Sequence, residues 1–328
     1  MTPRDPRPQD ASVQDEAPAF ADFDAPVAAG GYAWWYVDAQ SDDLAHGLTI
    51  IAFVGSVFSP YYAHARRRGP ADPLDHCALN VALYGTAGKR WTMTERGRAA
   101  LAHSATKLAI GHSALAFDGS TLTIDIDEVA APWPSRVRGQ VRVRTTALTR
   151  ATFALDAAGA HRWRPLAPCA RVEVELASPR LAWAGRGYLD ANAGDAPLAD
   201  AFTGWHWSRI VGPRHTTVLY DVARRDGSTL ALARRFDATG GVATTAPPAA
   251  ATLPATRWRI GRATRCDAGT APRVVETLED APFYARSLIE TQVDGERGTA
   301  MHESLDLDRF RARWVRALLP FRMPRRRR

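Results

Sequence analysis

Short runs in which apolar and polar residues alternate make up most of this chain, and glycine, proline and aspartate separate them. Residues 112–117 and 121–128 both alternate with a period of two, and the Asp-Gly-Ser sequence between them is typical of a hairpin turn. Residues 75–85 and 89–96 form another such pair. Strands that recur with turn signals at intervals of about 8 to 12 residues are typical of a sandwich or barrel. We therefore predict an all-β protein with little helix.

Composition divides the chain into four parts. Residues 1–22 are rich in proline, aspartate, glutamine and alanine without periodicity, so we expect this segment to be disordered. Residues 162–170 carry two prolines and are interpreted as the passage between two β-domains. The expected division is a first domain over residues 23–165, a second over residues 166–308, and a basic tail over residues 309–328.

The two halves resemble each other in layout. Each contains a glycine, a tryptophan-rich strand, a polar break, a histidine and a second β-rich run, and Trp35 and Trp207 lie about half the chain apart. The identity between the two stretches is slight. We interpret this as a weak internal repeat, which favours two similar β-domains in tandem.

The greatest density of acidic, basic and aromatic side chains lies in residues 185–224. In residues 205–209 the period of a strand places Trp205, Trp207 and Arg209 on one face and His206 on the other. In residues 218–222 the same period separates Tyr220 from Asp221. Neighbouring strands could bring these groups together as a site. The alternative is that the tryptophans fill a β-core while His206 and Asp221 make hydrogen bonds at its rim.

Length, cysteines and motifs exclude several classes of protein. No run of about 18 apolar residues is present, so no transmembrane helix is expected. The first residues lack the apolar centre of a signal peptide, which favours a cytoplasmic protein. Three scattered cysteines and nine scattered histidines indicate neither disulfides nor a metal site. The sequences GxSxG, GxGxxG, GKS/T and HExxH are missing, so hydrolase, dinucleotide, P-loop and zincin functions have no support.

The net charge of +7 is concentrated at the C-terminus, where the last 20 residues contain nine arginines. The body of the chain is close to neutral, which argues against a nucleic-acid partner. The basic tail also contains Trp314, Leu318, Leu319 and Phe321. This combination favours peripheral binding to an anionic membrane surface, on the cytoplasmic side, by apolar insertion and by the arginines Arg322 and 325–328. The alternative is a solvated tail.

Several segments together resemble the acyclic carotenoid 1,2-hydratase family. The resemblance extends from about residue 23 to residue 320 and rests on residues 31–39, 46–62, 76–85, 93–97, 187–192, 205–209 and 219–222. It implies two lipocalin-like antiparallel β-barrel domains, no cofactor, and the addition of water across the terminal C1=C2 bond of an acyclic carotenoid such as neurosporene or lycopene. In related domains outside the family an acidic residue often precedes the tryptophan pair. Ala33 stands there in this chain, which favours the second domain as the site.

The chemistry of such a hydration selects the candidate residues. An unactivated alkene needs a strong proton donor, stabilisation of a tertiary cation, and one held water. Asp190 and Asp221 are the candidate acids, because burial raises the pKa of a carboxyl group and keeps it protonated. If neither served, Glu95 or Glu303 would be the next candidate. The remaining candidates are Trp207 or Trp205 for the cation, His206 and Tyr220 for the water, and Trp205, Trp34, Trp35 and Tyr36 for binding the substrate. The rival function is a lipocalin-like carrier of an apolar ligand.

Overall fold

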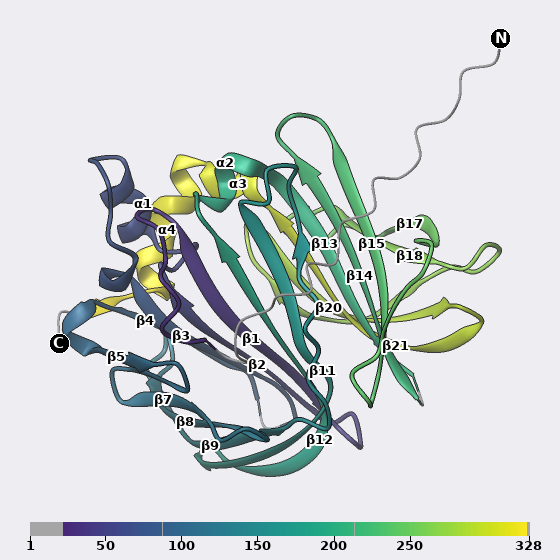
Figure 1. The fold of residues 1–328 in the computed structure, drawn as a ribbon, viewed down its shortest axis with the longest axis horizontal. Helices are drawn as coiled ribbons and strands as arrows, with labels where there is room; N and C mark the ends of the chain where they lie inside the picture. Colours follow the sequence, from purple (N-terminus) through teal and green to yellow (C-terminus); the bar gives the residue numbers. More distant parts are fainter. Residues whose placement is uncertain (1–21, 87, 213, 327–328) are drawn as a thin grey trace.

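Two large curled β-sheets form the protein, and a cluster of short helices lies at one end of them (Figure 1). The computed structural model describes residues 22–86, 88–212 and 214–326. The expected disorder of residues 1–22 falls almost entirely outside the described residues. The all-β prediction is confirmed, and helix is confined to short segments.

The first sheet has 13 strands in the order β22-β4-β3-β2-β1-β12-β11-β9-β8-β7-β6-β5, with β10 paired to β11. Its pairs are antiparallel except for the short β22 against β4. Its strands are β1 (Tyr32–Ser41), β2 (His46–Val54), β3 (Cys77–Gly85), β4 (Arg90–Arg96), β5 (Leu101–Ser104), β6 (Lys107–Ile110), β7 (Ser113–Phe117), β8 (Thr121–Val129), β9 (Arg136–Arg144), β10 (Phe153–Ala154), β11 (His161–Ser178), β12 (Arg180–Gly194) and β22 (Arg325–Arg326).

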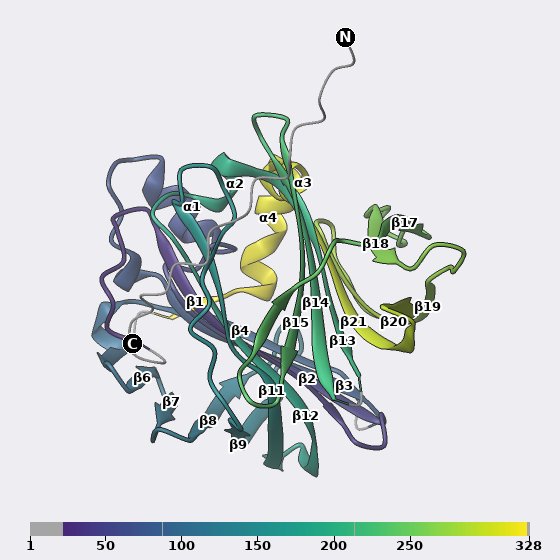
Figure 2. The ribbon, with the colours of Figure 1, turned by 45° about the vertical axis from the view of Figure 1, so that its right-hand side comes forward.

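The second sheet has seven strands in the order β16-β15-β14-β13-β21-β20-β19. They are β13 (Phe202–Val211), β14 (His215–Arg224), β15 (Thr229–Asp237), β16 (Val242–Thr244), β19 (Arg273–Asp280), β20 (Tyr284–Val293) and β21 (Glu296–Asp306). A hairpin of β17 (Ala249–Leu253) and β18 (Arg262–Cys266) lies against β13, β14, β20 and β21, on the face turned away from the first sheet (Figure 2).

The same strand order recurs in both sheets. Strands β1 to β4 form a meander, and β12 pairs with the free side of β1. Strands β13 to β16 form the second meander, and β21 pairs with the free side of β13. Trp35 lies on β1 and Trp207 on β13, so the similar layout of the two sequence stretches corresponds to equivalent strands.

The long strands β11 and β12 run through the segment that the sequence suggested as a passage between domains. Residue 165 lies inside β11, and the register between β11 and β12 shifts at Pro165/Ala167 and at Ala167/Ala170. Proline has no N–H for the ladder, so it falls at such irregularities instead of ending the strand. Both strands belong to the first sheet. The chain passes to the second sheet only after Gly194.

The helices close one end of the space between the sheets (Figures 1 and 2). They are α1 (Pro60–Arg66), α2 (Leu198–Ala201), α3 (Leu307–Arg311) and α4 (Arg313–Arg322), and the 3₁₀ turns are η1 (Pro73–Asp75) and η2 (Arg98–Ala100). Helix α1 begins at Pro60, and the Ser59 side chain accepts a hydrogen bond from the N–H of Tyr62, so its first turn is capped. No helix among the described residues is long and apolar enough to cross a membrane.

The basic tail is folded onto the first sheet. Val315 and Leu319 of α4 are buried in the core between the sheets. Arg325 on β22 forms an ion pair with the buried Glu95 of β4 and a hydrogen bond with His76. Leu319 and Arg325 therefore do not have the exposure that the membrane hypothesis expected of them. Residues 327–328 lie outside the described residues.

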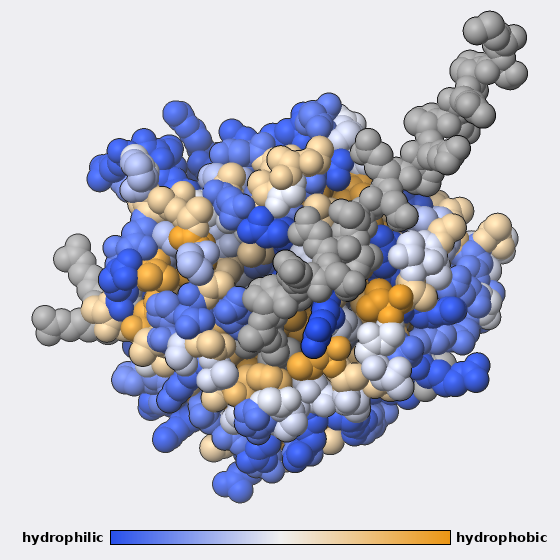
Figure 3. Space-filling view, in the orientation of Figure 1, coloured by the Kyte–Doolittle hydropathy of each residue, from blue (hydrophilic) through white to orange (hydrophobic). Residues whose placement is uncertain are grey.

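Strand β1 separates two apolar cores, which explains why its sequence is nearly continuously apolar. Ala33, Trp35 and Val37 point into the core enclosed by the first sheet, whereas Trp34 and Tyr36 point into the core between the two sheets. With these side chains inside, the face shown in Figure 3 is mostly hydrophilic, and its hydrophobic residues form small separate areas.

Candidate functional site

Asp190 is a buried carboxyl group in the middle of the core between the sheets. Its Oδ2 accepts hydrogen bonds from Trp163 Nε1 at 2.9 Å and from the Tyr188 hydroxyl at 2.8 Å. The residue is only 4% exposed. Burial raises the pKa of Asp190 to about 7, because a carboxylate in the apolar interior loses its hydration. At neutral pH a large fraction of the molecules therefore carries Asp190 as the neutral acid.

The hydrogen bonds around Asp190 indicate which oxygen carries the proton. Oδ2 already accepts two donors, whereas Oδ1 has one contact, at 3.3 Å, with Asn192 Nδ2. The acidic proton is best placed on Oδ1. If Oδ2 carried it, this proton would lie close to the hydrogens that Trp163 and Tyr188 already direct at Oδ2. Trp163 and Tyr188 thus fix the orientation of the acid and leave Oδ1 as its donating end.

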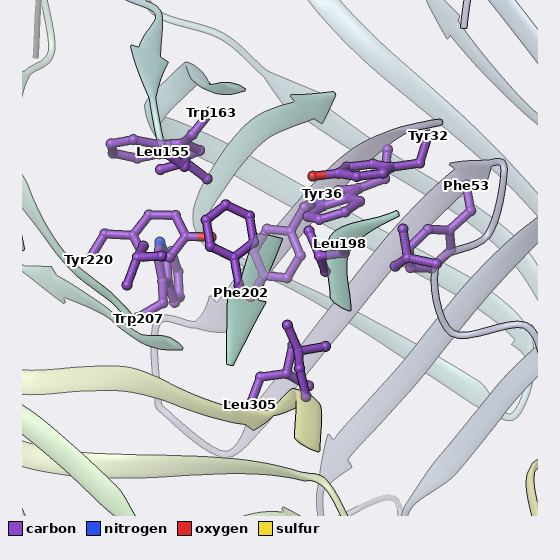
Figure 4. Close-up of a cluster of buried hydrophobic side chains, with 14 of the residues drawn as sticks. Tyr32, Tyr36, Phe53, Leu155, Trp163, Leu198, Phe202, Trp207, Tyr220 and Leu305 are labelled. Carbon is purple, nitrogen blue, oxygen red and sulfur yellow. The ribbon is translucent and has the colours of Figure 1, made fainter. Parts of the chain in front are cut away.

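Several aromatic residues of the core that contains the acid are drawn in Figure 4, among them Tyr36, Trp163, Trp207 and Tyr220. Tyr36 is the direct partner of Asp190 in the register between β1 and β12, so the two side chains lie side by side on one face. The Trp207 ring lies 5.6 Å from that of Tyr36 and 5.4 Å from that of Tyr188, both edge to face. Tyr220 packs against Trp163 at 5.6 Å. Aromatic rings in this position can stabilise a cation formed beside Asp190.

Alternation along five strands builds this cluster. His161 and Trp163 lie two residues apart on β11, and Tyr188, Asp190 and Asn192 alternate on β12. Residues two apart share a face, so each strand delivers its polar and aromatic groups to the same core. The members contributed by the other strands are Tyr32, Trp34 and Tyr36 from β1, Trp205 and Trp207 from β13, and Tyr220 from β14.

His161 is a second titratable group on the aromatic face of β11. Its Nδ1 lies 2.9 Å from the Tyr32 hydroxyl, and its ring packs edge to face on Phe202 with ring centres 4.9 Å apart. Burial lowers the pKa of His161, because the imidazolium form would lose hydration. The imidazole is neutral at neutral pH and can accept a proton.

A network of buried charges joins the sheets beside the aromatic cluster. Asp38 of β1 pairs with Arg209 of β13 at 2.6 Å and with Arg286 of β20. Arg286 also pairs with Glu303 of β21, whose Oε1 accepts a hydrogen bond of 2.8 Å from the Tyr36 hydroxyl. Burial is the largest cause of the raised pKa of Asp190, and the negative charges of Glu303 and Asp38 raise it further.

An open cavity of about 430 Å³ lies at the end of β13 opposite to α2. Its lining includes Arg209, which is 2% exposed, together with the rim residues Arg186, His215 and Arg297. The cavity thus lies against one end of the buried charge network. The opposite end of the core is covered by the helices.

Three predicted site residues lie away from this cluster. Asp221 is the register partner of His206, on the face of the second sheet covered by β17 and β18, where Arg265 binds it at 2.7 Å. His206 Nδ1 lies 2.9 Å from Ser304 Oγ on the same face. Trp35 packs against Phe23 in the other core, at 4.8 Å. The structure thus unites Asp190, Trp207, Tyr220, Trp205, Trp34 and Tyr36 but not Asp221, His206 and Trp35.

Glu95 and Glu303, the next candidates for the acid, lie in different parts of the structure. Glu95 is buried between His76 and Arg325, whereas Glu303 lies near Asp190 but is held by Arg286. Within residues 22–86, 88–212 and 214–326, no group of three or more histidine, cysteine, aspartate or glutamate side chains is arranged to hold a metal ion.

Comparisons with known proteins identify the family of this chain. The family described as carotenoid hydratase CrtC matches residues 50–328. The chain belongs to the carotenoid hydratase family. The protein is therefore an enzyme of the hydro-lyase class. The acyclic carotenoid 1,2-hydratase of Thiocapsa roseopersicina is 60% identical over 92% of this chain and 75% of its own length. The acyclic carotenoid 1,2-hydratase of Rubrivivax gelatinosus is 52% identical over 93% of this chain and 76% of its own length.

Solved structures show the same fold at low identity. CghA superposes with a TM-score of 0.57 over 90% of this chain and 98% of its own, at 13% identity. Kievitone hydratase from Nectria haematococca superposes with a TM-score of 0.52 over 90% of this chain and 95% of its own, at 10% identity. At these identities the likeness concerns the fold, and it confirms the lipocalin-like architecture.

Sequence reasoning missed Trp163, Tyr188 and His161. Each lies two residues from another member of the cluster, so alternation from Asp190 would have found Tyr188. Trp163 and His161 carried no such signal, because the prolines at 165 and 168 suggested a linker there. Asp38 and Arg286 also went unnoticed, since only the pairing of the two sheets brings them together.

Proposed function

We propose that this protein adds water across the terminal C1=C2 bond of acyclic carotenoids, such as neurosporene and lycopene, with Asp190 as the proton donor. The observation that carries the proposal is the pKa of Asp190, raised to about 7 by burial in an aromatic core. A general acid is most effective when its pKa lies near the working pH. The hydratase names of the relatives support the reaction class.

In the first step Asp190 Oδ1 gives its proton to C2, and the electron pair of the double bond forms the new C–H bond. The positive charge then rests on C1, which is tertiary. The rings of Trp207, Tyr36 and Tyr188 stabilise it through cation–π attraction, worth about 0.5 to 2 kcal/mol for each well-placed ring. The resulting carboxylate of Asp190 remains held by Trp163 and Tyr188.

In the second step a water oxygen bonds to C1 and loses one proton. We assign the acceptance of this proton to His161, whose neutral imidazole contacts Tyr32 and Phe202 of the same core as Trp163. Tyr220 stays a candidate for orienting the water, because it packs on Trp163. Return of the proton to Asp190 completes the cycle, so that the product is the carotenoid plus one water and the enzyme is unchanged.

The proposal is tested with the purified chain and lycopene in detergent, in D₂O. The expected product has gained one water and carries one deuterium on the carbon next to the new alcohol carbon. Asp190→Asn is expected to bind the carotenoid without converting it, as judged by the shift of its absorption spectrum. Binding without conversion by the wild-type chain would contradict the proposal and favour the carrier function instead.

A further inference from the structure

Helix α4 carries two apolar stripes, and only one of them is covered. Val315 and Leu319 are buried against the core between the sheets. Trp314, Leu318 and Phe321 follow the helical spacing along the adjacent side and are 47%, 46% and 72% exposed. An amphipathic helix in a soluble protein normally places polar residues at such positions. The second stripe therefore calls for an explanation beyond folding.

A residue from a distant part of the chain extends this stripe. Trp258, 43% exposed, stacks on Trp314 with ring centres 5.9 Å apart and planes inclined by 24°. Its position is fixed, since its carbonyl accepts a hydrogen bond from Arg309 Nη1 and Asp280 Oδ2 accepts one from its N–H. We call Trp258, Trp314, Leu318 and Phe321 the aromatic patch.

Positive charges border the aromatic patch. Arg257 and Arg259 flank Trp258, and Arg313 precedes Trp314; all three are exposed. Two acidic side chains beside these residues have partners in the protein. Asp280 accepts backbone hydrogen bonds from residues 257 and 258, and Asp308 pairs with Arg225. The exposed arginines at 257, 259 and 313 thus place positive charge at the border of the patch, complementary to an anionic surface.

We propose that the aromatic patch is a docking surface for a lipid bilayer with anionic headgroups. Tryptophan, phenylalanine and leucine beside arginines form the combination that settles in the headgroup region, where rings meet acyl chains and cations meet phosphates. The patch borders the helix-covered end of the core, where Phe310 of α3 contacts Phe58 and Phe283. If the proposed function holds, a carotenoid passing from the bilayer would reach Asp190 through this aromatic end.

The first test is co-sedimentation of the full chain with vesicles of phosphatidylcholine, with or without phosphatidylglycerol, in the absence of carotenoid. The triple variant Trp314→Gln, Leu318→Gln, Phe321→Gln should bind anionic vesicles about tenfold or more weakly, because the burial of three large side chains in the interface is lost. The matched control is Trp133→Gln, since Trp133 is 84% exposed but lies in the loop between β8 and β9 of the first sheet, far along the chain from α4. It should bind like the wild type.

Trp258→Gln serves as a second variant, because it alters the aromatic patch without changing α4. It should also weaken binding while its thermal unfolding stays close to that of the wild type. Unchanged binding by both patch variants would overturn the proposal. So would failure of the wild type to bind either kind of vesicle while forming dimers that the triple variant abolishes, since the patch would then be an interface between two copies.

A second readout separates this proposal from the proposed function. The triple variant should lose hydration of lycopene embedded in anionic vesicles but retain hydration of lycopene in detergent. Loss in both media, in a variant that remains folded, would show that the aromatic patch acts on catalysis and not on docking. If the wild type hydrated nothing in either medium while still binding vesicles, the proposed function would fail and the docking surface would stand.

Discussion

Asp190 and Asp221 were equal candidates in the sequence, and the structure places them in opposite environments. Asp190 lies among aromatic rings, and only neutral donors contact its oxygens. Asp221 lies on the other face of the second sheet, where Nε and Nη2 of Arg265 bind its carboxylate. An arginine stabilises the charged form of a carboxyl group, whereas apolar burial stabilises the neutral form. Asp190 is thus in an environment that favours the protonated acid, with its pKa raised to about 7 by burial.

The difference shows what the period of two can and cannot decide. Alternation correctly separated Trp205 and Trp207 from His206, and Tyr220 from Asp221. It does not say which face meets the other sheet. The aromatic face of β13 and β14 turned toward the first sheet, and the polar face was covered by β17 and β18. His206 and Asp221 therefore share a face with each other but not with the proposed acid.

Replacing the two aspartates separately gives the largest expected effect. Asp190→Asn should lower kcat by about 10²- to 10⁴-fold, the usual contribution of a general acid. The fold should persist, because the asparagine oxygen can accept the bonds from Trp163 and Tyr188. Its amide would take the place of Oδ1, which faces Asn192 Nδ2, so the Asn192 side chain must turn over to present its unpartnered Oδ1 as the acceptor. Asp221→Asn is the matched control.

Hydration rates of both variants in detergent, with far-UV circular dichroism as a check on folding, decide the outcome. Asp221→Asn should retain a rate close to that of the wild type. If instead Asp221→Asn were inactive and Asp190→Asn active, the assignment of the acid would be reversed.

The pH dependence of stability should also distinguish Asp190. Its pKa is raised from 3.8 to about 7, so the folded state favours the protonated form. The stability associated with this proton is fully present below about pH 4 and is lost as pH rises through about 7. Asp190→Asn, which never ionises, should therefore gain stability relative to the wild type between pH 5 and pH 8. Chemical denaturation of both proteins at pH 5 and at pH 8 measures the difference in their free energies of unfolding. A difference that does not grow from pH 5 to pH 8 would contradict the raised pKa.

Removing a donor to Asp190 should move the pH profile of activity. The hydroxyl of Tyr188 stabilises the carboxylate and so lowers the pKa of Asp190, although burial outweighs it. Tyr188→Phe should raise that pKa and shift the decline in kcat/KM, expected near pH 7 in the wild type, to higher pH. Loss of one hydrogen bond is worth about 1 kcal/mol, or less than one pH unit. Rates measured from pH 5 to pH 9 test this, and a shift toward lower pH would be inconsistent with it.

The sequence predicted the fold class and half of the cluster, and the reasons for the remainder are physical. Strand periodicity placed Trp207 and Tyr220 because local geometry dictates which neighbours share a face. The Asp38–Arg286 pair joins residues that are distant in the chain, so no local pattern could show it. Prolines made residues 162–170 resemble a linker, yet β11 accommodates them at register shifts. Trp163, the neighbour that orients Asp190, was hidden within that segment.

The smallest effect concerns the ion pair of Asp221 with Arg265. The side chains are 24% and 19% exposed, so solvent weakens their attraction, and partly exposed pairs contribute about 1 kcal/mol or less. Arg265→Gln should therefore lower the free energy of unfolding only slightly, and the hydration rate should not change, because the pair lies on the face of the second sheet away from Asp190. Denaturant titration and the detergent assay measure the two quantities. A large loss of activity with intact folding would mean that the two faces of the second sheet are coupled, and that Asp221 acts on the site from behind the strand.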